Sequence, residues 1–108
     1  MAYPPAAGHI IRIADGVYLP HGGSFPLAVT DAEDQVLRAF LRRPAMTLDE
    51  LQDQSGLEHA AKVLARLAQK YDGAFAPAIH RPGARGRGGY AVLVADAGVH
   101  GPRGTAVQ

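Results

Sequence analysis

The sequence lacks cysteine and tryptophan, and it has no long hydrophobic run. Without cysteine, a disulfide framework and a thiolate metal site are excluded. The apolar runs fall far short of the roughly 20 residues that a membrane-spanning helix needs. The stretch 1–5 has neither the basic segment nor the apolar core of a secretory signal. We therefore expect a cytoplasmic protein without membrane contact.

Motifs of catalysis and of cofactor binding are also missing. The sequence has no Gly-x-x-x-x-Gly-Lys loop for a nucleotide and no serine or histidine in the context of an activated nucleophile. The histidines do not have the spacing of metal ligands; they are His9, His21, His59, His80 and His100. We therefore expect neither an enzyme nor a bound cofactor or metal.

What the sequence does contain is a block of positive charge. The formal net charge of the chain is +1, but residues 31–58 have a balance of −4 and residues 59–87 a balance of +5. Such a block is typical of a surface that binds nucleic acid. A basic surface that contacts only solvent explains the charge equally well.

Three capping boxes predict three helices. In such a box a serine or threonine hydroxyl accepts a hydrogen bond from the backbone three residues later, where a carboxylate side chain bonds back. The boxes are Thr30–Glu33, Thr47–Glu50 and Ser55–Glu58. The first helix is expected to end before Pro44, because proline excludes the preceding residue from the helical region. The second is expected to end near Gln54 and the third near Tyr71. Together the helices predict a compact core around five side chains: Leu37, Phe40, Leu51, Leu64 and Leu67.

Short β-strands are predicted on both sides of the helices. Before them, three runs predict a small antiparallel sheet: 9–13, 17–19 and 25–29. Pro26 places the last run at a sheet edge, because proline cannot donate a ladder hydrogen bond. After the helices, two runs predict a β-hairpin around a loop rich in glycine and arginine: 75–80 and 90–94. The domain is therefore expected over residues 9–94, with a flexible N-terminus at 1–8 and a disordered tail at 95–108.

The third predicted helix has a polar face of the kind that DNA-binding helices use. Its apolar residues recur at the spacing of a buried stripe: Leu57, Ala60, Val63, Leu64, Leu67, Ala68 and Tyr71. Its polar residues recur on a different face: His59, Lys62, Arg66, Gln69 and Lys70. A major groove is about 12 Å wide and admits such a helix. The alternative is an amphipathic core helix whose basic side is solvated.

The predicted hairpin carries three arginines among glycine and proline: Arg81, Arg85 and Arg87. Folding alone does not explain them, because a loop of this composition buries nothing. Arginines beside a duplex lie along phosphates or enter a narrow minor groove. Two alternatives are a solvated loop and an RNA-binding segment, since Arg87–Gly89 has the Arg-Gly-Gly composition of such segments. With the polar face of the third helix, these arginines form the predicted DNA-binding set.

Three motifs stand at the junctions of the predicted elements. Val29–Glu33 approximates a Leu-Thr-x-x-Glu start of a first helix, and Arg43–Pro44 followed by Thr47–Leu51 is similar to its end and to the start of a second. Arg85–Tyr90 is similar to an Arg-Gly-x-Gly-Tyr hairpin ending with one extra residue. In this order the motifs resemble the winged helix-turn-helix effector domain of OmpR-type bacterial response regulators. The resemblance implies an α+β fold and a transcriptional regulator that binds double-stranded DNA sequence-specifically. Its third helix would lie in the major groove and its hairpin wing on phosphates or in the minor groove.

The chain departs from this family in two respects. Only Ser55–Gly56 separates the second and third helices, where the family has a long loop that often contacts RNA polymerase, so that contact is not implied. A plain winged helix of the MarR or ArsR kind is the alternative. No receiver domain precedes the helices, so control by phosphorylation is not implied either. The alternative function is an adaptor that binds another regulator or RNA polymerase through its acidic residues 31–58. No heptad or additional helix predicts an oligomeric state.

Overall fold

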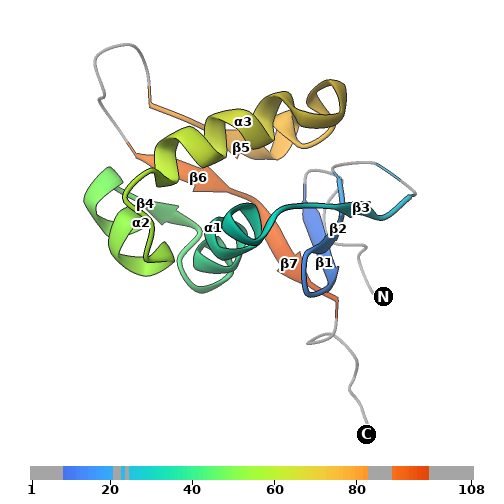
Figure 1. Ribbon diagram of the computed structural model, residues 1–108, viewed down its shortest axis with the longest axis horizontal. Coiled ribbons are helices and arrows are strands. Elements are labelled where there is room, and N and C mark those ends of the chain that lie inside the picture. Colours follow the sequence, from blue (N-terminus) through green and yellow to red (C-terminus); the bar gives the residue numbers. More distant parts are fainter. Residues whose placement is uncertain (1–8, 21–22, 24, 83–88, 98–108) are drawn as a thin grey trace, which may run out of the picture.

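Three α-helices pack with two small groups of β-strands in the computed structural model, which describes residues 9–20, 23, 25–82 and 89–97 (Figure 1). These residues form a mixed α+β domain with two β-sheets. One sheet has the strand order β3-β2-β1-β7 and is called the N-terminal sheet below. The other has the order β4-β6-β5 and is called the hairpin sheet. None of the helices in the described parts of the chain is long and apolar enough to cross a membrane.

The N-terminal sheet begins with the antiparallel pair β1 (Ile10–Ala14) and β2 (Val17–Leu19), joined at Gly16, whose φ of +71° favours glycine. The strand β3 (Leu27–Ala28) pairs with β2 at the edge of the sheet, as Pro26 predicts, although it is shorter than expected.

The fourth strand of this sheet was not expected from the sequence. The strand β7 (Val94–Asp96) pairs in parallel with β1, and the Ala97 amide donates a hydrogen bond to the Arg12 carbonyl at 2.9 Å. The prediction of a disordered tail from residue 95 was therefore wrong for residues 95–97. Residues 1–8 and 98–108, the other predicted flexible parts, lie outside the described residues.

The first two capping boxes form as predicted. The helix α1 (Asp31–Arg42) follows Thr30, and α2 (Leu48–Ser55) follows Thr47. In each box the threonine hydroxyl accepts from the backbone three residues on at 3.2 Å, and the glutamate accepts from the threonine amide at 2.9 Å. The helix α1 stops at the extended Arg43, directly before a proline, as expected.

The third capping box does not form. Ser55 is the last residue of α2, and its hydroxyl accepts a hydrogen bond from the Leu57 amide at 3.2 Å. Gly56 follows with a left-handed φ of +74°, the usual way for a helix to end at glycine. The helix α3 (Ala60–Gly73) begins later, after His59, without a side-chain cap. The prediction was wrong because Ser55 and Gly56 end one helix instead of beginning the next.

The last turn of α3 departs from helical geometry. Lys70 is extended, with ψ of 147°, and Tyr71 and Asp72 have left-handed φ values of +53° and +58°. The regular helix therefore ends at Gln69. Tyr71 was predicted to face the core, but it is 43% exposed and donates its hydroxyl hydrogen bond to the Ala28 carbonyl at 2.6 Å.

The hairpin sheet follows α3. Instead of the strand predicted over 75–80, the chain forms a short 3₁₀ turn, Ala76–Ala78, around Pro77 and then the strand β5 (Ile79–His80). The antiparallel pairing of β5 with β6 (Tyr90–Val92) confirms the predicted hairpin.

The strand β4 (Ala45–Met46), which lies between α1 and α2, pairs with the other side of β6. A Cβ atom on Gly89 would lie 2.8 Å from the Met46 carbonyl oxygen, so this close approach requires glycine. The chain then passes from β6 through Leu93 into β7 and so connects the two sheets (Figure 1).

The core lies where the helices meet the two sheets. All five side chains predicted for its centre are at most 1% exposed. Phe75 and Val92 join them from the hairpin side, and Ile10 and Tyr18 from the N-terminal sheet. This core holds α3 against α1 and α2 through Ala60, Leu64 and Leu67, which leaves the opposite side of the helix in solvent.

Candidate nucleic-acid interface

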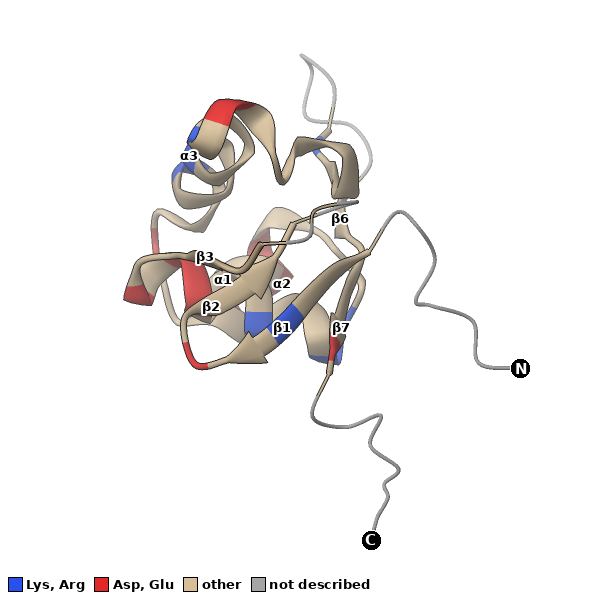
Figure 2. Cartoon of the chain, turned by 90° about the vertical axis from the view of Figure 1, so that its right-hand side faces the viewer, with Lys and Arg blue, Asp and Glu red and all other residues tan. Residues whose placement is uncertain are grey.

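The outward face of α3 carries most of the residues predicted to contact DNA. His59, Lys62, Arg66 and Gln69 are all exposed. Both views place α3 at the top of the domain, with β1 and β7 of the N-terminal sheet in its lower part (Figures 1 and 2). Arg81, which follows β5, is exposed as well. Arg85 and Arg87 lie outside the described residues.

The lysines and arginines of the described residues fall into two sets. Five of them have a polar partner within the chain: Arg12, Arg38, Arg42, Arg43 and Lys70. The other three have no ion pair or hydrogen bond with any part of the chain that the structure describes: Lys62, Arg66 and Arg81. All three of these unpaired cations belong to α3 or to the residue after β5. The described side chains that remain free to neutralise an external anion therefore lie on α3 or beside it.

Lys70 lies differently from its neighbours on α3. Its Nζ atom is 2.8 Å from Oε1 of Glu33, whose side chain is only 8% exposed. The same Glu33 oxygen accepts the capping hydrogen bond of the Thr30 amide. Lys70 therefore neutralises a buried carboxylate at the start of α1, and we no longer count it among the cations available to a ligand.

A groove of about 620 Å³ separates α3 from the hairpin sheet. Two small side chains of α3, Ala61 and Ala65, line it together with Ile79 and Pro82. Four polar side chains also line it: Lys62, His80, Arg81 and Tyr90. No carboxylate is among the described residues that line it. His80 was not predicted to belong to the site. In the sequence, only its position beside Arg81 pointed to it. The proximity of β5 to Lys62 arises from the fold and leaves no pattern along the chain.

A second hollow, of about 340 Å³, lies on the other side of Lys62, toward the start of α1. It brings together three of the predicted residues, His59, Lys62 and Arg66, over the apolar side chains of Leu57 and Val63. Glu58 also lines it, so its charge is mixed. The two hollows leave Lys62 on a ridge between them.

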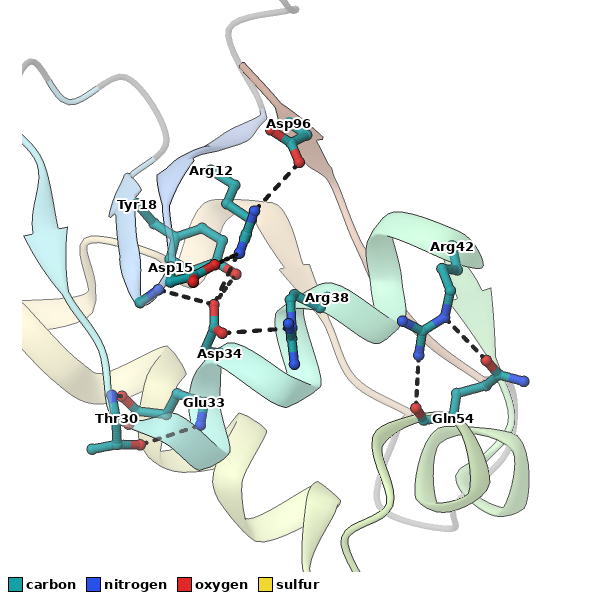
Figure 3. A network of polar contacts seen from close by, with 11 residues as sticks. Arg12, Asp15, Tyr18, Thr30, Glu33, Asp34, Arg38, Arg42, Gln54 and Asp96 are labelled. Atoms are coloured by element: carbon teal, nitrogen blue, oxygen red, sulfur yellow. Dashed lines mark hydrogen bonds and ion pairs between the residues drawn. The ribbon is translucent and has the colours of Figure 1, made fainter. Parts of the chain in front are cut away.

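The acidic stretch 31–58 is less available than its sequence suggests. Asp34 accepts hydrogen bonds from the Tyr18 hydroxyl at 2.6 Å and from the Gly16 amide at 3.2 Å. It also lies 3.5 Å from Nε of Arg38 and 3.8 Å from Nε of Arg12 (Figure 3). Burial raises the pKa of Tyr18, and its hydrogen bond to the Asp34 carboxylate raises that pKa further. Asp34 therefore serves the fold, as does Glu33, and neither contributes to an acidic docking face.

The described residues hold no group of three or more histidines and carboxylates that could bind a metal ion. Comparison with known proteins found no matching family, no matching curated protein and no matching solved structure. The function therefore has to be inferred from the arrangement of residues in this chain.

Proposed function

We propose that this protein is a winged helix-turn-helix transcriptional regulator that binds double-stranded DNA through α3 and the β5–β6 hairpin. The observation that carries the proposal is the division of the described cations. Those of α1, β1 and the end of α3 have partners within the chain, whereas Lys62, Arg66 and Arg81 have none among the described residues and lie on α3 or beside it. Unpaired cations on one face are what a polyanion requires.

The geometry of α3 supports this proposal. Its regular part, Ala60–Gln69, is about 15 Å long at 1.5 Å per residue. It is preceded by α2 and a short connection, as in a helix-turn-helix, and is flanked by the hairpin, which takes the place of a wing. A helix with these dimensions and an exposed polar side fits the major groove.

The exposed side chains suggest a division of roles. Arg66 lies on the outward side of the regular helix and carries the planar guanidinium that pairs with guanine in the major groove. Lys62 and Arg81 flank the first groove and contact phosphates. His59 and Gln69 supply further polar contacts at the two ends of the helix. Arg85 and Arg87 would extend the contact along the hairpin.

Duplex binding tests the proposal directly. Fluorescence anisotropy with a random 20-base-pair duplex should show binding that weakens steeply as salt rises. After selection of a preferred sequence, Arg66→Ala should cost about 1–3 kcal/mol and relax the preference at one base pair. Arg42→Ala is the matched control, because this exposed arginine is held by Gln54 of α2.

Three outcomes would overturn parts of the proposal. An absence of salt-dependent duplex binding, with capture of a regulator or RNA polymerase instead, would favour the adaptor. Tighter binding to single-stranded RNA than to duplex DNA would favour the RNA-binding alternative. A uniform loss over all sequences in Arg66→Ala would show that Arg66 contacts a phosphate and not a base.

A further inference from the structure

The polar side chains that line the groove between α3 and the hairpin sheet can all donate hydrogen bonds. Lys62 contributes an ammonium from α3, Arg81 a guanidinium from the hairpin, and His80 and Tyr90 an imidazole and a phenol from β5 and β6. Each of these groups donates hydrogen bonds, and two of them carry a fixed positive charge. The second hollow differs, because Glu58 places a carboxylate on its wall. The first groove is therefore the better match for an anion that offers only acceptor oxygens.

The space in this groove depends on two small residues. Ala61 and Ala65 are one helical turn apart and lie on the side of α3 that faces the groove. A longer side chain at either position would extend into the groove. The two alanines thus leave space in the groove between the helix and the hairpin, which Lys62 and His80 also line.

We propose that this groove binds a phosphodiester group of the DNA backbone and that His80 contacts this group together with Lys62 and Arg81. The inference rests on the proposed function and deepens it, because it assigns the strand contact beside α3 to a specific site with a specific ligand chemistry. A phosphodiester carries two unesterified oxygens, which accept hydrogen bonds and share one negative charge. It therefore matches the donors of the groove.

The groups that face His80 across the groove are Lys62 on α3, Arg81 in the hairpin and Tyr90 on β6, none of them a carboxylate. A phosphate in the groove therefore meets hydrogen-bond donors and no negative charge among the described residues. Removal of the His80 imidazole should weaken DNA binding.

Two variants test the site in different ways. Ala65→Leu fills the groove without changing the charge of the protein, and His80→Ala removes the imidazole without changing the packing of α3. Gln35→Leu is the control, since it adds an apolar side chain at an exposed position of α1 that lines neither hollow. Each protein is titrated into the same duplex at several salt concentrations, and each is melted to confirm its fold.

The groove site predicts three results. Ala65→Leu should lose about tenfold in affinity, the loss of one charge-assisted hydrogen bond, with a salt slope smaller by about 0.9. His80→Ala should lose about fivefold in affinity, the loss of one hydrogen bond to the phosphate. Gln35→Leu should behave as the parent does.

The failures of the two proposals are distinguishable. If the parent does not bind duplex DNA, the proposed function itself is wrong. If the parent binds and His80→Ala binds as tightly as the parent, the groove does not hold the phosphate, although the function stands. Because His80→Ala leaves the helix unchanged, this second result remains decisive even if Ala65→Leu does not fold.

Discussion

Charged side chains around the N-terminal sheet and on α3 are put to different uses. Beside β1 and β2, Asp34 accepts a hydrogen bond from the Tyr18 hydroxyl and lies near two arginines (Figure 3). The Asp34 side chain is 11% exposed. On α3, Lys62 and Arg66 extend into solvent without a partner among the described residues. The net charge of +1 hides this difference. The positions of the cations without a partner, and not the total number of cations, indicate where a polyanion can bind.

Burial explains the division. A carboxylate that is removed from water costs free energy unless a cation or several hydrogen-bond donors accompany it. Glu33 and Asp34 are both buried at the start of α1, so they hold Lys70 and, more loosely, Arg12 and Arg38. Lys62 and Arg66 precede Lys70 on α3, and neither forms an ion pair with a carboxylate among the described residues.

The greatest predicted loss of stability follows a substitution in the buried cluster around Asp34. Asp34→Ala should destabilise the domain by about 3–5 kcal/mol, because it leaves the Tyr18 hydroxyl without its acceptor and removes a carboxylate beside the largely buried Arg12. Urea unfolding measures the loss. Asp31→Ala, at an exposed position in the same turn, should cost less than about 1 kcal/mol. An equal loss in the two variants would mean that the cluster is not structural.

A smaller effect separates the two lysines of α3. Lys70→Ala should cost about 1–3 kcal/mol of stability, because Glu33 would keep a buried oxygen without its cation. It should leave duplex affinity nearly unchanged. Lys62→Ala should do the reverse, with a stability change within about 0.5 kcal/mol and a clear loss of affinity. If Lys70→Ala weakened DNA binding as much as Lys62→Ala, the original prediction for Lys70 would be right.

The smallest effect concerns Tyr18 in alkaline solution. Burial and Asp34 raise the pKa of Tyr18, so its contribution to stability is fully present below the ordinary tyrosine pKa of about 10 and is lost as pH rises above it. The unfolded chain releases this proton first, which gives a slope of up to about 1.4 kcal/mol per pH unit above pH 10. Stability curves at pH 9, 10 and 11 should show that slope, and Tyr18→Phe should flatten it. The same decline in both proteins would assign it to other groups.

The sequence predicted best what depends on neighbouring residues. The capping boxes at Thr30 and Thr47 formed because both partners lie within one turn, and the apolar spacing of Leu64 and Leu67 identified the buried side of α3. At Ser55 the same local pattern misled, since Gly56 permitted a left-handed end to the preceding helix.

Features that depend on distant residues were missed. The strand β7 exists because β1, more than 80 residues earlier, offers it a free edge. The periodicity of α3 placed Lys70 with the DNA-binding residues, yet Glu33 on another helix holds it. His80 entered the candidate site because the hairpin lies beside α3, and no spacing along the chain contains that information.

The salt dependence of duplex binding in two triple variants with the same net charge tests whether the unpaired cations hold the DNA. One replaces the three unpaired cations with alanine: Lys62, Arg66 and Arg81. The other replaces three partnered arginines with alanine: Arg38, Arg42 and Arg43. Each phosphate contact that is lost reduces the magnitude of the slope of log affinity against log salt by about 0.9. We predict a slope smaller by about 2–3 in the first variant and nearly unchanged in the second. Equal losses in both would overturn DNA binding by the unpaired cations, because they would show that only the total charge of the protein matters.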